Sequence, residues 1–217
     1  MKTDTKRKLL AVFFPERCPY CGDVIKPLDI ACEDCKEEMT SDKIITQIAG
    51  IYEVLSPFPY DGKYKDAILK IKFGKRKQFA PQLADIMAES LKKYKDVSQF
   101  DVITFVPLHK DTLKNRGFNQ SELLARYLSE KLNIPCETLL KKTKKNKPQH
   151  KLLARERKKN VEGVFGCTDK KLIKKRRILL VDDIVTTGLT LSECIKVLKS
   201  NGAEEIFCIT FAKSQPK

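Results

Sequence analysis

The sequence predicts an α/β fold, in which a parallel sheet is flanked by helices and preceded by a small N-terminal unit with four cysteines. Three observations lead to this prediction. From residue 51 onward, short apolar segments alternate with segments of helical periodicity, which is the pattern of parallel strands joined by right-handed crossovers. Two Cys-x-x-Cys pairs precede this region, and acidic and hydroxyl residues gather between one apolar segment and the helix after it.

The N-terminal unit carries two cysteine knuckles, Cys18 with Cys21 and Cys32 with Cys35, separated by ten residues. Four thiolates at this spacing complete a tetrahedral Zn²⁺ site, and Gly22 can take the positive φ that such turns use. Because so short a unit cannot bury an adequate core, we expect a structural zinc ion to hold it together. A redox-active pair of dithiols is the alternative. Four cysteine ligands leave no open position for metal catalysis.

The rest of the chain supplies the sheet and its helices. We expect residues 1–8 to be frayed and residues 40–50 to be a link, and we divide the chain into a zinc ribbon (1–50) and an α/β domain (51–217). Strands are predicted at residues 51–58, 102–106, 134–140, 178–181 and 205–212. Helices are predicted at 67–73, 81–93, after residue 120, and at 189–198, with a stop at Asn201-Gly202.

The segment ILLVDDIVTTGLT, residues 178–190, carries the clearest chemistry. Two carboxylates, Asp182 and Asp183, stand where the predicted strand ends, and a loop rich in hydroxyls leads to the next helix. The unpaired N–H groups of a helix start attract anions, and two ionised carboxylates accept hydrogen bonds from a vicinal diol. A ribose 5-phosphate combines both features. The loop residues expected to bind its phosphate are Thr186, Thr187, Gly188 and Thr190. The alternative is that the threonines only cap the helix.

Positive charge is the second indication of function. The chain has 43 Lys and Arg against 28 Asp and Glu, a net charge of +15, which attracts polyanions. Residues 141–159 hold ten Lys or Arg and one acid, and we expect a mobile loop that becomes a short helix near 152–157. This segment is either a solvated insertion or a clamp that closes over pyrophosphate or a nucleic-acid backbone. The candidate nucleic-acid contacts are Lys142, Lys144, Lys145, Lys147, Arg155 and Arg157.

The order of these motifs resembles a known family. VDDIVTTGLTL is similar to the phosphoribosyl pyrophosphate (PRPP) signature of type I phosphoribosyltransferases. Together with the cysteine knuckles, VPLH, RGFNQSELLA and the set Gln149, Leu152, Arg157 and Asn160, it resembles the ComF family of competence-associated proteins. The resemblance implies a zinc ribbon joined to a phosphoribosyltransferase-like, Rossmann-like domain. It also implies that Asp182 and Asp183 are the catalytic pair that holds the ribose. The residues it places near the pyrophosphate are Leu108, His109 and Arg116.

The family therefore implies a cytoplasmic competence protein that binds single-stranded DNA and carries a PRPP pocket, with structural Zn²⁺ and with Mg²⁺ accompanying PRPP. DNA-uptake or recombination proteins are further expected partners, and no apolar run is long enough for a membrane span. The alternative is an active Mg²⁺-dependent phosphoribosyltransferase with an unidentified acceptor. No acceptor site is recognisable, although Tyr52, Phe58 and Tyr60 are candidates for stacking a base. Catalysis therefore stays open.

Overall fold

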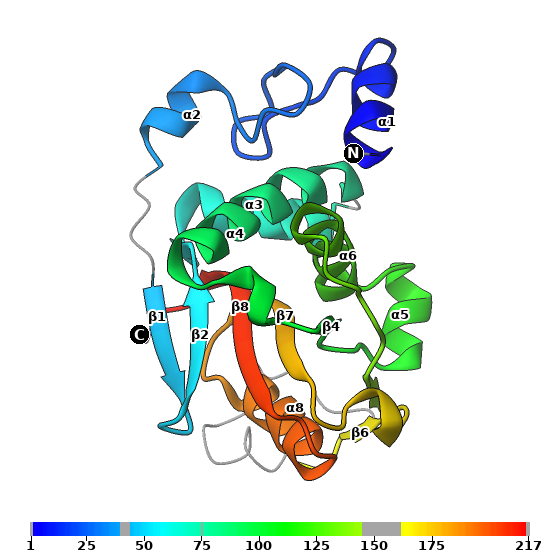
Figure 1. Ribbon diagram of the computed structural model, residues 1–217. Helices are drawn as coiled ribbons and strands as arrows, with labels where there is room; N and C mark the ends of the chain where they lie inside the picture. Colours follow the sequence, from blue (N-terminus) through cyan, green and yellow to red (C-terminus); the bar gives the residue numbers. More distant parts are fainter. Residues whose placement is uncertain (1, 40–43, 75, 145–161, 216–217) are drawn as a thin grey trace.

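Six strands form the central sheet of the protein. They are β1 (Ile44–Ile48), β2 (Tyr52–Ser56), β3 (Phe58–Pro59), β4 (Val102–Phe105), β7 (Arg177–Val185) and β8 (Glu205–Lys213). The computed structural model describes residues 2–39, 44–74, 76–144 and 162–215 (Figure 1). The strand order is β1-β2-β8-β7-β4, with β3 paired to β8 beside this path. All pairs are parallel except β1 with β2, so the predicted α/β class is confirmed.

Helices cover both faces of this sheet (Figure 1). On one face α3 (Gly62–Lys72), α4 (Ala80–Tyr94) and α6 (Gln120–Leu132) pack against Leu179, Val181 and Phe207. On the other, α8 (Leu189–Ser200) and a hairpin of β5 (Leu140–Lys142) and β6 (Phe165–Cys167) cover Ile178 and Leu180. Successive residues of β7 thus enter opposite cores, as strand alternation requires. The remaining elements are α1 (Lys2–Ala11), α2 (Glu33–Glu37), α5 (Lys110–Arg116) and the 3-10 turns η1 (Lys77–Phe79), η2 (Val97–Gln99) and η4 (Lys170–Leu172).

The helix limits follow from local chemistry. Asn119 caps α6, because its side-chain oxygen accepts from the N–H of Ser121, and Asn133 ends it in the left-handed conformation at φ 56°. After α8, Gly202 takes φ +90°, the predicted left-handed stop. The four predicted helices are confirmed as α3, α4, α6 and α8. The helix α3 begins five residues before its predicted start, at the point where the Asp61 side chain caps it.

Of residues 1–8, predicted to be frayed, residues 2–8 instead belong to α1, so that prediction is wrong for them. The reason is a tertiary contact. Both terminal nitrogens of the Arg7 guanidinium are engaged, one with Glu16 at 2.7 Å and the other with Asp85 on α4 at 3.2 Å. Since all three side chains are nearly buried, this ion-pair cluster fastens the N-terminal helix to the rest of the fold.

Three predictions about the strands need correction. Residues 44–48, assigned to a link, form β1, because Ala49 and Gly50 take positive φ and turn the chain back onto β2. The hairpin therefore spans the boundary predicted at residue 50. Of the predicted strand 134–140, only Leu140 belongs to a strand, the first residue of β5, and Cys136 makes an isolated bridge with Ile103, beside Pro135, which has no N–H to donate. Pro57 likewise separates β2 from β3 within the predicted strand 51–58.

The N-terminal cysteine unit packs on α3. The Lys70 ammonium donates to the carbonyl oxygens of Pro19 at 3.0 Å and Tyr20 at 2.7 Å. The buried ring of Tyr20 meets Tyr64 edge to face at 5.8 Å, and Tyr64 stacks on Phe58 at 3.9 Å. The unit and the α/β domain therefore share one hydrophobic core.

None of the helices in the described ranges combines the length and the apolar character needed to cross a membrane.

Candidate ribose-phosphate site and metal centre

The four predicted cysteine ligands converge. Their sulfur atoms all lie within 4.8 Å of one another, and those of Cys21 and Cys32 are 3.5 Å apart. A tetrahedral Zn²⁺ with Zn–S bonds of about 2.3 Å places its sulfurs about 3.8 Å apart, so the cluster fits this ion. Gly22 makes the first turn at φ +96°, and Cys32 stands at the start of α2, which carries Cys35.

The thiol groups themselves also suit a metal. All eight cysteines of the chain are free thiols, so no disulfide competes for these sulfurs. Burial acts to raise the pKa of Cys18, but the backbone N–H groups of Cys21, Cys32 and Tyr20 outweigh it and lower the pKa to about 7. The same donors would stabilise a metal-bound thiolate. The four-cysteine cluster can therefore hold a metal ion, and its donor set fits structural zinc.

The acidic pair lies within a strand, not beyond its end as predicted. β4 stops at Phe105, which pairs with Val181, whereas β7 continues to Val185 and keeps its pairing with β8. Asp182 and Asp183 therefore project just past the carboxyl end of β4 while their backbone stays in the sheet. In open parallel sheets this edge is where ligands bind.

Each aspartate has a defined partner. The Ser121 hydroxyl donates to Asp182 Oδ1 at 2.7 Å, and the Lys72 ammonium lies 3.4 Å from Asp183 Oδ2. Burial and, after it, the neighbouring Asp183 carboxylate raise the pKa of Asp182 to about 7, although the hydrogen bond from Ser121 opposes the rise. The two carboxylates thus differ: Asp183 faces a cation, and Asp182 titrates near neutrality.

This pKa leads to a prediction. A ribose hydroxyl needs an ionised acceptor, and Asp182 holds a proton below its pKa of about 7. Ligand binding should therefore weaken about tenfold between pH 8 and pH 6, and binding at pH 6 should release about one proton from Asp182. Calorimetric titration with PRPP and Mg²⁺ at both pH values measures this. In Asp182→Asn the dependence should vanish. Equal affinity of the unmodified chain at both pH values would contradict the prediction.

The loop after the acidic pair encloses a small hollow. Its volume is about 30 Å³, and Asp182, Thr186, Gly188 and Thr190 are among the lining residues. Gly188 takes φ +75° at the start of α8, and a Cβ there would lie 2.9 Å from the Ile48 side chain of β1. Thr187 is exposed beside it. The structure thus brings the predicted phosphate loop and the acidic pair together at one sheet edge. Phosphate binding stays a prediction.

The residues predicted near the pyrophosphate lie on the neighbouring loop. Leu108 and His109 follow β4, and the His109 ring nitrogen Nδ1 accepts from the N–H of Asp111, so His109 caps α5. Arg116, at the end of α5, donates to Gln120 at 2.7 Å and stands over the Phe73 ring at 5.7 Å. Burial lowers the pKa of Arg116, and Asp183 opposes this effect. Arg116 is thus a second cation beside the acidic pair.

The predicted nucleic-acid contacts are only partly described. Lys142 lies in β5, half-buried, with its ammonium 5.4 Å from the Phe165 ring centre. Burial lowers its pKa, while Cys194 and Asp182 act in the other direction, so Lys142 is close enough to Asp182 for the two charges to interact. Lys144 is exposed. The other predicted contacts lie outside the described residues: Lys145, Lys147, Arg155 and Arg157. The same holds for the motif positions 149, 152 and 160.

Sequence reasoning missed three participants: Ser121, Lys72 and Ile48. The sequence indicated only that Ser121 lies near the start of a helix, and its partner Asp182 is 61 residues away. Lys72 belonged to a lysine-rich stretch that is typical of solvated surface, and Ile48 fell in the predicted link. No local signal distinguishes these residues, since their roles depend on distant parts of the chain.

Comparison with known proteins identifies the family of this chain. The profile of the phosphoribosyl transferase domain matches residues 114–217. Competence protein F of Haemophilus influenzae is 33% identical over 196 residues, covering 87% of this chain and 81% of that protein. The chain belongs to the ComF family. The DNA utilization protein YhgH of Escherichia coli is 29% identical over 198 residues, covering 88% of this chain and 82% of that protein.

Solved structures give a weaker likeness to this ComF family chain. The glutamine PRPP amidotransferase of B. subtilis has 21% sequence identity and a TM-score of 0.40. The similarity covers 60% of this chain and 25% of that enzyme, so the chain spans about a quarter of its length. The phosphoribosyltransferase-like fold is shown by the profile match and the sheet described above.

Proposed function

We propose that this chain is a competence protein that binds single-stranded DNA and holds a ribose-phosphate ligand, PRPP with Mg²⁺, at residues 182–190. The arrangement that supports this most directly is the acidic pair beside the glycine-containing loop at one edge of the sheet. The names of its relatives, competence protein F and DNA utilization protein, support the role in DNA handling.

In this proposal the carboxylates of Asp182 and Asp183 accept from the two ribose hydroxyls. The 5-phosphate lies against the loop that starts α8, where N–H groups and threonine hydroxyls donate to it. Lys72 and Arg116 come from α3 and α5, and not from this loop. The Lys72 ammonium pairs with Asp183, and the Asp183 carboxylate acts on the pKa of Arg116. The two cations would neutralise a pyrophosphate group, with Mg²⁺ entering alongside PRPP, since this ion prefers phosphate and carboxylate oxygens.

A second candidate is catalysis of phosphoribosyl transfer to an acceptor. The specific observation in its favour is that Lys72 and Arg116 put positive charge beside the acidic pair, where it would stabilise a departing pyrophosphate. Binding and positioning of the ribose would be common to both candidates. Release of pyrophosphate in the presence of Mg²⁺ and an acceptor distinguishes the enzyme from a binding module.

DNA binding is tested by its dependence on salt. We expect a fluorescent 20-nucleotide single strand to bind with an affinity that falls steeply as salt rises, by about 0.7 log units per log unit of salt for each phosphate contacted. Lys144→Glu and Lys147→Glu together should weaken binding and flatten that slope. Lys92→Glu, a charge reversal on the exposed side of α4, is the matched control. Undetectable or salt-independent binding would contradict the proposal.

A further inference from the structure

The phenylalanines of this chain divide sharply by exposure. Eight of the eleven are buried, and three are not: Phe13 is 79% exposed, Phe14 75% and Phe73 69%. Scattered single apolar residues on a surface are ordinary, but a pair of adjacent, almost fully exposed rings is not. All three exposed rings line cavities that also contain cationic side chains.

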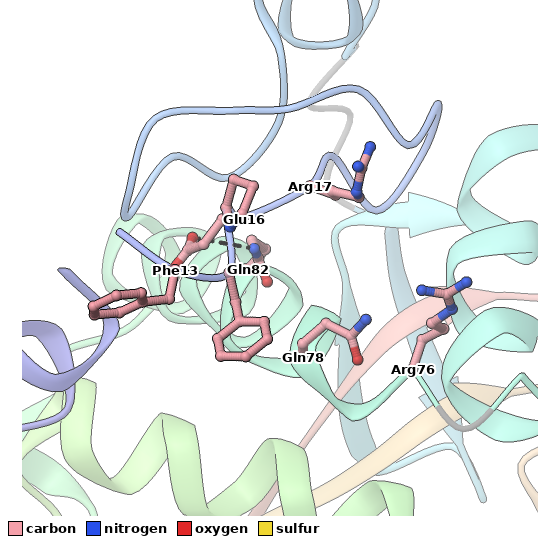
Figure 2. A pocket seen from close by; sticks show the side chains of 8 residues that line it. Phe13, Glu16, Arg17, Arg76, Gln78 and Gln82 are labelled. Carbon is pink, nitrogen blue, oxygen red and sulfur yellow. Dashed lines mark hydrogen bonds between the residues drawn. The ribbon is translucent and has the colours of Figure 1, made fainter. Parts of the chain in front are cut away.

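The first cavity has a volume of about 450 Å³ and lies between the turn after α1 and the start of α4. One segment of the chain contributes Phe13, Phe14 and Arg17 to its lining, and a second segment contributes Arg76 and Gln78. Figure 2 shows the Phe13 ring toward one end and the guanidinium groups of Arg17 and Arg76 toward the other. Such a volume accommodates a nucleotide-sized group.

The second cavity, of about 310 Å³, adjoins the candidate ribose-phosphate site. It is lined by Lys72, Phe73 and Arg116 together with Thr112 and Asn115. Lys72 also contacts Asp183, so this cavity opens beside the acidic pair. Lys72 and Phe73 line the second cavity and the nearby Arg76 and Gln78 line the first, so this part of the chain lies between the exposed Phe pair and the candidate ribose-phosphate site.

The exposed pair is held in place. The N–H groups of Phe13 and Phe14 both donate to the carbonyl of Leu10, at 3.2 and 2.8 Å, which fixes the turn to α1. After the pair in sequence, Glu16 accepts two hydrogen bonds from Arg7, at 2.9 and 2.7 Å. Glu16 is the one acidic residue lining either cavity in the described part of the chain, and Arg7 neutralises it.

We propose that a single-stranded nucleic acid lies along Lys72, Phe73, Arg76 and Gln78, with bases stacked on Phe13, Phe14 and Phe73 and backbone phosphates held by Arg17 and Arg76. Exposed rings that alternate with cations are the combination that binds single strands without sequence preference, because every base offers a face for stacking. Along this path the nucleic acid runs from the N-terminal cysteine unit to the acidic pair. This inference rests on the proposed DNA binding and adds where and how the strand is held.

The test uses full-length, zinc-loaded protein and a labelled 20-nucleotide oligo(dT). Phe13→Ala with Phe14→Ala should weaken binding about tenfold or more and leave the salt dependence unchanged, because stacking involves no counterion release. Phe13→Leu with Phe14→Leu, which keeps apolar surface, should bind as weakly as the paired alanine variant. Phe13→Trp with Phe14→Trp should bind as tightly as the unmodified protein. Arg76→Gln should flatten the salt slope by about 0.7. Ile51→Ala, also at a 75% exposed apolar residue but outside both cavities, is the control.

The outcomes separate the two proposals. If the unmodified protein binds no single strand, the proposed function fails. If the unmodified protein binds, and both Phe13→Ala with Phe14→Ala and Phe73→Ala bind as tightly as it does, the inference of base stacking on these rings is overturned while the proposed function stands. Restoration by leucine as complete as by tryptophan also overturns it, because such a result indicates an apolar surface for a protein partner. Zinc content and melting temperature confirm that each variant is folded.

Discussion

Replacing Cys18 by serine, or stripping the metal with a chelator, is expected to unfold the N-terminal cysteine unit. Cys18 is fully buried in a cluster whose four sulfurs lie within 4.8 Å of one another. Zinc contributes about 10–16 kcal/mol of apparent binding free energy in small zinc peptides, and this contribution is lost with the metal. We expect loss of the bound zinc, measured by metal analysis, and a lower melting temperature, measured by calorimetry.

The control for this prediction is Cys167→Ser. The Cys167 thiol lies outside the cluster and donates to Asn201, which a serine hydroxyl can also do. That variant should keep one zinc ion per chain and its stability. A wild-type protein that binds no zinc and forms disulfides between the knuckles would contradict the structural role and favour the redox alternative.

Loss of the zinc should also affect the ribose-phosphate site. One helix, α3, contacts both regions: Lys63 donates to the Cys35 carbonyl, Lys70 to the carbonyls of Pro19 and Tyr20, and Lys72 pairs with Asp183. When the cysteine unit unfolds, Lys63 and Lys70 lose these acceptors and the Tyr20 ring leaves the core. The helix that presents Lys72 to the acidic pair is then less firmly held.

Gly188→Ala is expected to disrupt the phosphate loop. The added Cβ would lie 2.9 Å from both Cδ1 and Cγ1 of Ile48, and alanine at φ +75° is strained even in open space. Because Ile48 is buried and β-branched, it has little freedom to move away. We expect a stability loss of about 2–4 kcal/mol and loss of PRPP binding, measured by denaturant unfolding and calorimetric titration.

A matched pair of variants separates the two causes. Gly50→Ala has the same backbone cost at φ +71°, with nothing within 4 Å of the new Cβ, so it should cost only about 1–2 kcal/mol and leave binding intact. In Gly188→Ala with Ile48→Ala, the clash is removed while the strain remains. If Gly188→Ala binds PRPP as well as the unmodified chain, the loop is not the phosphate site.

Local patterns predicted the fold well where one segment carries its own signal. The junction of residues 178–190 shows this, since the order strand, loop and helix was predicted, although β7 continues through the acidic pair to Val185. The cysteine cluster and the stop at Gly202 were predictable for the same reason. In each case the residues that decide the structure are close together in sequence.

The misses depended on contacts between distant residues. The helix α1 is held by Arg7, whose partner Asp85 is 78 residues away. β1 is a strand because it pairs with β2, although residues 44–48 resemble a link. The predicted strand 134–140 had the right apolar pattern, but Pro135 and the left-handed Asn133 prevent continuous pairing with β4. The partners of the acidic pair, Ser121 and Lys72, were hidden for the same reason.

The most direct test of the proposed site is calorimetric titration of the zinc-loaded protein with PRPP and Mg²⁺, repeated with Asp182→Asn and Asp183→Asn combined, and with single-stranded DNA present. We predict saturable binding by the unmodified protein, loss of that binding in the double variant, and competition by DNA, because both ligands would approach the acidic pair. Unchanged PRPP binding in the double variant, or no PRPP binding by the unmodified protein, would contradict the assignment of residues 182–190 as a ribose-phosphate site.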